Sequence, residues 1–230
     1  MLRLAHRGDW RHGPENSIAA LAAAVAVPGC DGVEFDVRIS GDGVPVLSHD
    51  ETLERAYGRP GRIDEMTARE LEEVGIASLA DALAIIPHRS TIDVDLKGLH
   101  DRAVVEVLAA GRGPTLVNGV ISSFLPETLQ RVGRLAPAWP RWLNARHVSA
   151  DTIRTASDLG CAAISLEFHA IDPASVAAVH AAGLEVAAWT VRDQRKTSRS
   201  RSSLRVKLRS LSSVGSGSDW LDAAPGKTRS

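Results

Sequence analysis

The sequence predicts an α/β fold, a TIM-type (β/α) barrel, on three observations. Short apolar segments alternate with alanine-rich segments along most of the chain, which is typical of repeated β-then-α units around a parallel sheet. The length of 230 residues is close to the roughly 250 of such a barrel. Charged residues also gather at the ends of the apolar segments, where these barrels place their active sites.

Seven apolar segments are predicted strands: residues 2–8, 31–39, 90–97, 119–124, 140–144, 162–168 and 185–191. Four segments between them are predicted helices: residues 16–27, 101–110, 126–135 and 172–183. Helix starts are indicated by Asn16, Ser17, Pro126 and Pro173, and helix ends by Gly29, Gly111 and Gly183.

One connection departs from the β-then-α order. Residues 33–40 and 44–50 are joined only by the turn 41–43, which is too short for a parallel crossover. The two segments are therefore expected to form an antiparallel hairpin inserted in the barrel. Folding about this turn would place Asp36 opposite Ser48 and His49, so that a carboxylate and an imidazole converge.

Composition indicates an ordinary globular protein, with 44% hydrophobic and 24% charged residues. Residues 195–230 hold nine of the 27 Lys/Arg but only two of the 28 Asp/Glu, so residues 1–194 carry a net negative charge. This acidic part of the chain argues against a nucleic-acid partner. No apolar run reaches the roughly 20 residues of a membrane span, and no apolar leader is seen, so a cytoplasmic location is expected. The distant Cys30 and Cys161 predict reduced thiols.

Two predicted strands carry groups suited to catalysis or metal binding. His6 and Arg7 end the first strand and offer a proton-transfer group beside a fixed cation. Glu34 and Asp36 alternate with apolar neighbours, so both carboxylates lie on one strand face. Two like charges held together favour a divalent cation.

A third strand repeats this acidic pattern. Asp93 and Asp95 alternate with apolar residues, and Lys97 follows on the same face. A strand end with a carboxylate and an ammonium group adds an oxygen ligand and a positive charge. Together with the first two strands, it predicts a site for a divalent cation and a phosphate ester.

The chain resembles the glycerophosphodiester phosphodiesterase family over roughly residues 3–192, through AHRG, PENS, GVEFDVRISGDGVPVLSHD, IDVDLK, ISSF and AWTV in that order. Residues 34–50 are the most specific part of the resemblance. It implies a TIM-type barrel that hydrolyses glycerophosphodiesters to an alcohol and glycerol 3-phosphate. It also implies an acid/base histidine pair and one divalent metal ion, Mg²⁺ or Ca²⁺.

The resemblance also assigns roles to residues of this chain. It implies catalysis by His6 and His49, metal binding by Glu34, Asp36 and Asp95, phosphate binding by Arg7 and Lys97, and support by Glu15. Asp95 stands where the family commonly has glutamate, so its side chain is one methylene shorter, and Asp93 is a less favoured substitute. Trp189, at a predicted strand end, is a candidate for lining the substrate pocket, with a core role as the alternative.

The C-terminal part departs from the family pattern. Arg192 replaces the usual asparagine, the usual glycine-aspartate closing strand is missing, and the sequence from Gln194 onward is rich in Ser and Arg. We therefore expect a barrel domain over residues 1–193 and a poorly ordered tail over 194–230, with incomplete or irregular closure. A shifted reading frame or a divergent terminus would explain such a tail.

Two further functions stay open. One is a related lysophospholipid phosphodiesterase, which a membrane-facing apolar loop would indicate, although none is evident in the sequence. The other is a catalytically impaired barrel that binds phosphate esters, which the missing closing strand suggests. The expected partner is a small-molecule glycerophosphodiester substrate, with no stable membrane insertion, and the sequence leaves the oligomeric state open.

Overall fold

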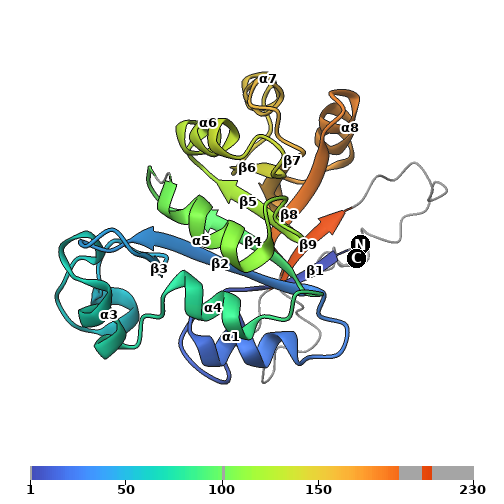
Figure 1. Cartoon of the computed structure of the whole chain (residues 1–230). Coiled ribbons are helices and arrows are strands. Elements are labelled where there is room, and N and C mark those ends of the chain that lie inside the picture. Colours follow the sequence, from blue (N-terminus) through green and yellow to red (C-terminus); the bar gives the residue numbers. More distant parts are fainter. Residues whose placement is uncertain (1, 100–101, 192–203, 209–230) are drawn as a thin grey trace.

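Strands and helices alternate along the computed structural model, which describes residues 2–99, 102–191 and 204–208 (Figure 1). Seven strands of a single sheet run parallel to one another, and β1 pairs with β2. They are β1 (Leu2–His6), β2 (Gly32–Ile39), β4 (Thr91–Leu96), β5 (Gly119–Ser123), β6 (Arg141–Ala145), β7 (Ala163–Glu167) and β8 (Glu185–Val191). All seven predicted strands are confirmed, and with them the barrel fold.

The four predicted helices are also present, as α1 (Ile18–Val25), α5 (Arg102–Arg112), α6 (Pro126–Leu135) and α8 (Pro173–Ala181). The Ser17 hydroxyl caps α1 by accepting a hydrogen bond from the Ala20 amide, 3.2 Å away. The prediction that Gly111 ends a helix is wrong, because it lies inside α5. The chain instead turns at Gly113, whose φ of +79° suits glycine.

Further helices surround the sheet or follow the hairpin. They are α2 (Glu54–Tyr57), α3 (Ala68–Val74), α4 (Leu79–Ile85) and α7 (Ala150–Asp158), with short 3₁₀ turns at Ile63–Glu65 and Phe168–Ala170. Helices α3 and α4 both begin with capping boxes, in which the Glu70 and Asp81 carboxylates accept hydrogen bonds from the backbone amides of Thr67 and Ser78. None of these elements was predicted from the sequence.

Alternation along each strand separates the core from the barrel interior. In β2 the apolar side chains of Val33, Phe35 and Val37 are fully buried in the main hydrophobic cluster, together with residues of the surrounding helices. Because successive side chains point to opposite faces, Glu34 and Asp36 lie on the other face, inside the barrel. Packing of the apolar face therefore fixes the direction of the acidic residues.

The predicted hairpin is confirmed. Strand β3 (Pro45–Leu47) pairs antiparallel with β2, with Val37 opposite Leu47 and Ile39 opposite Pro45. The turn contains Gly43 at a φ of +84°, and its amide donates to the Ser40 carbonyl over 3.0 Å. This register brings the residues that follow β3 alongside the middle of β2.

Closure of the barrel differs from the sequence expectation. Strand β9 (Leu204–Leu208) lies between β8 and β1 and pairs antiparallel with both, for example with Leu2 opposite Lys207 and Val186 opposite Leu208 (Figure 1). The backbone of β9 thus supplies a closing strand that the sequence did not predict. Closure is nevertheless irregular, since β9 runs against the other strands and the register shifts between Ala188 and Val191.

The rest of the predicted tail lies outside the described residues, as does Arg192. The domain boundary at residue 193 therefore stays a prediction. Among the described helices, each is too short or too polar to cross a membrane.

Candidate active site

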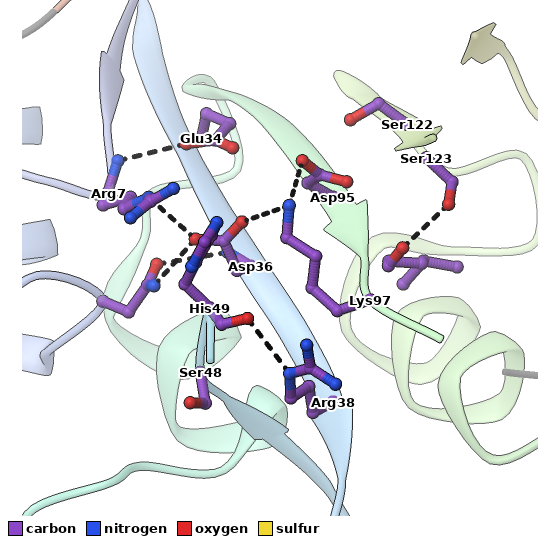
Figure 2. A network of polar contacts seen from close by, with 12 residues as sticks. Arg7, Glu34, Asp36, Arg38, Ser48, His49, Asp95, Lys97, Ser122 and Ser123 are labelled. Carbon is purple, nitrogen blue, oxygen red and sulfur yellow. Dashed lines mark hydrogen bonds and ion pairs between the residues drawn. The ribbon is translucent and has the colours of Figure 1, made fainter. Parts of the chain in front are cut away.

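Three carboxylates meet inside the barrel. Glu34 and Asp36 extend from β2 and Asp95 from the neighbouring β4, and their ligand atoms all lie within 4.8 Å of one another (Figure 2). The parallel register pairs Asp36 with Asp95, and all three residues are at most 1% exposed. The arrangement could hold a metal ion, and it shows that the short side chain of Asp95 reaches the cluster.

Two cations contact the cluster. The Lys97 ammonium lies 3.0 Å from Asp36 Oδ1 and 2.7 Å from Asp95 Oδ2, and Arg7 Nε lies 2.9 Å from Asp36 Oδ2 (Figure 2). Burial raises the pKa of the Asp36 carboxyl, but the charges of Lys97 and Arg7 outweigh burial and hold this pKa well below its ordinary value. Asp36 is therefore ionised at neutral pH.

Asn16 also orients Asp36. Its amide nitrogen donates to Asp36 Oδ2 over 2.9 Å, and its amide oxygen accepts from the Asp36 backbone over 3.1 Å. Asn16 has a φ of +60°, a left-handed conformation that asparagine tolerates better than most residues. Asn16 was predicted only as a helix-start residue, although it lies in the PENS motif.

Asp93, the less favoured metal ligand, lies outside the cluster. Its Oδ1 accepts a hydrogen bond from the Ser122 hydroxyl over 2.6 Å, deeper in the barrel interior. The next carboxylate along β4, Asp95, is the one that meets Glu34 and Asp36. The choice of Asp95 over Asp93 in the sequence analysis agrees with this geometry.

Both predicted histidines lie near the carboxylates. His6 ends β1, and its Nε2 is 3.7 Å from Glu34 Oε2. His49 follows β3 and lies beside Asp36 (Figure 2). Its Nδ1 is 2.6 Å from Asp50 Oδ1, and its carbonyl accepts from Arg38 Nε over 3.0 Å. The hairpin thus brings the second histidine to the barrel, as its sequence predicted.

Glu15 links two arginines at the edge of the site. Its Oε1 accepts from Arg7 Nη1 over 3.1 Å and also from the guanidinium of Arg55. Arg55 donates to Asp50 as well. The prediction that Glu15 supports the site agrees with its contact to Arg7, whereas Asp50 and Arg55 were not predicted to take part.

Trp189 contacts both the barrel strands and Phe124, while its role in lining a substrate pocket stays a prediction. Its indole nitrogen donates to the Ser165 carbonyl over 2.9 Å, which anchors the side chain in the barrel. Its ring meets Phe124 edge to face, with centroids 5.4 Å apart, and Lys97 Nζ lies 5.6 Å from the Phe124 ring centre. Trp189 and Phe124 therefore form an aromatic wall next to Lys97.

Comparison with known proteins gives a consistent result. The model of the glycerophosphoryl diester phosphodiesterase family matches residues 6–95 and 81–211. Human glycerophosphodiester phosphodiesterase 1 is 34% identical over 148 residues, which is 56% of this chain and 44% of the human protein. The chain therefore spans less than half the length of this relative.

Solved structures share the fold. A phosphodiesterase from Oleispira antarctica, in complex with the product sn-glycerol-3-phosphate, has a TM-score of 0.75 and 29% identity, covering 84% of this chain and 85% of that one. A glycerophosphodiester phosphodiesterase from Thermotoga maritima has a TM-score of 0.70 and 25% identity, covering 84% of this chain and 86% of that one.

Proposed function

Because the chain belongs to the glycerophosphoryl diester phosphodiesterase family, we propose that it hydrolyses glycerophosphodiesters to an alcohol and glycerol 3-phosphate. The observation that carries the proposal is the convergence of three buried carboxylates, two cations and two histidines at one end of the parallel strands. In β/α barrels this end holds the active site. The product bound to the Oleispira protein is the one expected here.

The residues of the cluster fit a divalent metal ion. Mg²⁺ and Ca²⁺ prefer oxygen ligands, and Glu34, Asp36 and Asp95 would supply carboxylate oxygens from two adjacent strands. When bound, such an ion would polarise the phosphoryl oxygen and neutralise negative charge. Burial of all three side chains keeps competing water away from these ligands.

Arg7 and Lys97 would hold the phosphate. Their side chains are each 13% exposed, so both are largely buried yet still accessible to a ligand. Each is already held by an acidic residue, so little side-chain freedom would be lost when the substrate binds. A phosphodiester anion placed between them would meet two fixed positive charges, which stabilise charge as the phosphorus is attacked.

His6 and His49 would share the proton transfers. One imidazole would accept a proton from the attacking hydroxyl, and the other would donate one to the departing alkoxide. The Nδ1 atom of His49 is engaged by Asp50, which leaves its Nε2 for proton transfer. Trp189 and Phe124 would form one wall of the pocket beside Lys97.

A metal-supplemented hydrolysis screen tests this proposal. The protein is assayed on glycerophosphocholine, glycerophosphoethanolamine and lysophospholipids with Mg²⁺, with Ca²⁺ and with a chelator. We expect turnover of at least one glycerophosphodiester that the chelator abolishes. A cation-dependent rise in melting temperature without any turnover would instead support a binding-only barrel.

An observation outside the metal cluster favours lysophospholipids as a second substrate class. Leu99, Phe124 and Leu125 are 57%, 39% and 38% exposed, on the loops after β4 and β5. The loop after β4 is held against α6, which follows the loop after β5, by a hydrogen bond from the Thr128 hydroxyl to the Gly98 carbonyl, 2.7 Å long. The sequence showed no membrane-facing loop. The apolar rim formed by Leu99, Phe124 and Leu125 would nevertheless offer an acyl chain an apolar surface.

A pair of substrates tests this second class. Lysophosphatidylcholine is compared with glycerophosphocholine in the parent protein and in Leu99→Ser. Contact with the rim predicts a preference for the acylated substrate that falls in the variant. Equal preference in both proteins would exclude a role for Leu99 in binding the chain.

A further inference from the structure

We propose that Asp50 and Arg55 are positioning residues that hold His49 in its working orientation, an inference that rests on the proposed function. Asp50 ends the motif of residues 34–50 and Arg55 lies beyond it, and the sequence predicted a role in the site for neither residue. Their importance follows from an unbroken series of polar contacts that leads from His49 to Arg7.

The first contact fixes the histidine ring. His49 Nδ1 lies 2.6 Å from Asp50 Oδ1, and an ionised carboxylate can only accept a hydrogen bond, so Nδ1 carries the proton. Nε2, on the opposite side of the ring, is then left for the substrate. The ring lies beside Asp36 (Figure 2), so a rotation about its side-chain bonds would change where Nε2 points in the site.

The second contact fixes the aspartate. Arg55, on α2, donates from Nε to Asp50 Oδ2, so the two oxygens of Asp50 bind different partners. Burial raises the pKa of Asp50, but the hydrogen bonds from Arg55 and His49 outweigh it and keep this pKa below its ordinary value. Asp50 is therefore an ionised acceptor whose orientation is set from both sides.

The third contact ties the hairpin to the first strand. The guanidinium of Arg55 also donates to Glu15 Oε1, which accepts from Arg7 Nη1 over 3.1 Å. Arg7 in turn contacts Asp36. Arg55 thus joins the segment that carries His49 to the segment that carries Arg7, and the two groups are held in one relative position across the site.

A role in folding alone explains Arg55 poorly. Its side chain is 53% exposed, and ion pairs of exposed side chains contribute little to stability. The planar guanidinium, in contrast, is suited to holding two carboxylates in a fixed geometry. Loss of Arg55 should therefore change the position of His49 more than it changes the stability of the barrel.

The test uses the full chain with Arg55→Met, Asp50→Asn and Arg55→Lys, and with Arg154→Met as the matched control. Arg154 forms an exposed ion pair with Asp151 on α7, 2.7 Å long and away from the site. We expect kcat to fall about 10- to 100-fold in Arg55→Met and Asp50→Asn, with little change in KM. This is the usual effect of removing a residue that orients a functional side chain from behind. Arg55→Lys should recover part of the loss, and Arg154→Met should match the parent.

A spectroscopic measurement separates positioning from stability. In nitrogen-15 NMR spectra of the resting protein, the Nδ1 proton of His49, identified by its absence in His49→Ala, should be protected from exchange in the parent. It should exchange faster in Arg55→Met, while the melting temperature stays near that of the parent. An unchanged resonance, or a kcat loss that only follows a lower melting temperature, would overturn the inference.

The same measurement keeps this inference distinct from the proposed function. The NMR signal is observed without substrate, so it reports on His49 even if the parent protein hydrolyses no glycerophosphodiester. Failure of the proposed function would appear as absent turnover in the parent. Failure of the positioning role would appear as equal exchange of the His49 proton in parent and Arg55→Met.

Discussion

Replacing Asp36 with asparagine should abolish the stabilisation of this protein by a divalent cation. Asp36 is fully buried, and it is the carboxylate of the cluster that contacts both Arg7 and Lys97. Asparagine keeps the size of the side chain but removes the negative charge and one of the two acceptor oxygens. The substitution therefore tests the charge of the cluster rather than the packing around it.

The size of the effect follows from simple electrostatics. A cation present at 100 times its Kd stabilises the folded state by about 2.7 kcal/mol, which for a chain of this size raises Tm by roughly 5 to 11 °C. One pair of unit charges roughly 4 Å apart in a protein site is worth about 4 kcal/mol. Losing it would weaken binding by roughly 10³-fold, so the same cation concentration would give almost no shift.

Thermal unfolding with and without Mg²⁺ or Ca²⁺ measures the effect, with Asp93→Asn as the matched control. Asp93 is an equally buried carboxylate on the strand of Asp95, but it accepts from Ser122 and lies outside the cluster. Asp93→Asn should keep the cation-induced shift. A shift of parental size in Asp36→Asn, or its loss in both variants, would refute the assignment of the metal site.

Three other changes follow from the structure. His6→Ala and His49→Ala should each lower turnover by roughly 10²- to 10⁴-fold. Circular dichroism should show that the fold is intact in both variants. Activity within a fewfold of the parent in both variants would contradict the two-histidine proposal. Val206→Pro should destabilise the protein by about 1–3 kcal/mol, because proline removes a backbone donor from β9. Val206→Thr keeps this donor and should not destabilise the protein. Equal melting temperatures of the two variants would argue against closure by β9. Acid should destabilise the parent more than Asp36→Asn, because the pKa of Asp36 is lowered in the folded state. The ionised Asp36 therefore stabilises the fold fully above about pH 4, the ordinary pKa range of this group. This stabilisation is lost as the pH falls through the lowered pKa. Identical acid unfolding curves would contradict this linkage.

The parallel strands and the acidic cluster could be predicted because both depend on local alternation. Apolar residues at every second position of β2 and β4 must face the helices, and this places Glu34, Asp36 and Asp95 inside the barrel. The glycine-containing turn at residues 41–43 likewise determines the hairpin that carries His49. Neither inference needs information about distant parts of the chain.

Other features depend on contacts that alternation does not encode. Strand β9 is short and charged, and its place follows from the unpaired edges of β1 and β8 rather than from an apolar pattern of its own. Asn16 was recognised as a helix-start residue, but its hydrogen bonds to Asp36 depend on the path of the chain between β1 and α1. The contact of Arg55 with Glu15 joins segments 40 residues apart, so sequence spacing alone could not reveal it.

The central claim is that the buried carboxylates and the histidines form a cation-dependent phosphodiesterase site. Phosphorus NMR of glycerophosphocholine hydrolysis, run with the parent protein and Asp36→Asn in the presence of Mg²⁺ or Ca²⁺, tests it most directly. We predict that the parent converts the diester to glycerol 3-phosphate, and that conversion stops with chelator and in Asp36→Asn. Conversion by Asp36→Asn at the parental rate, or by the parent in the presence of chelator, would contradict the claim.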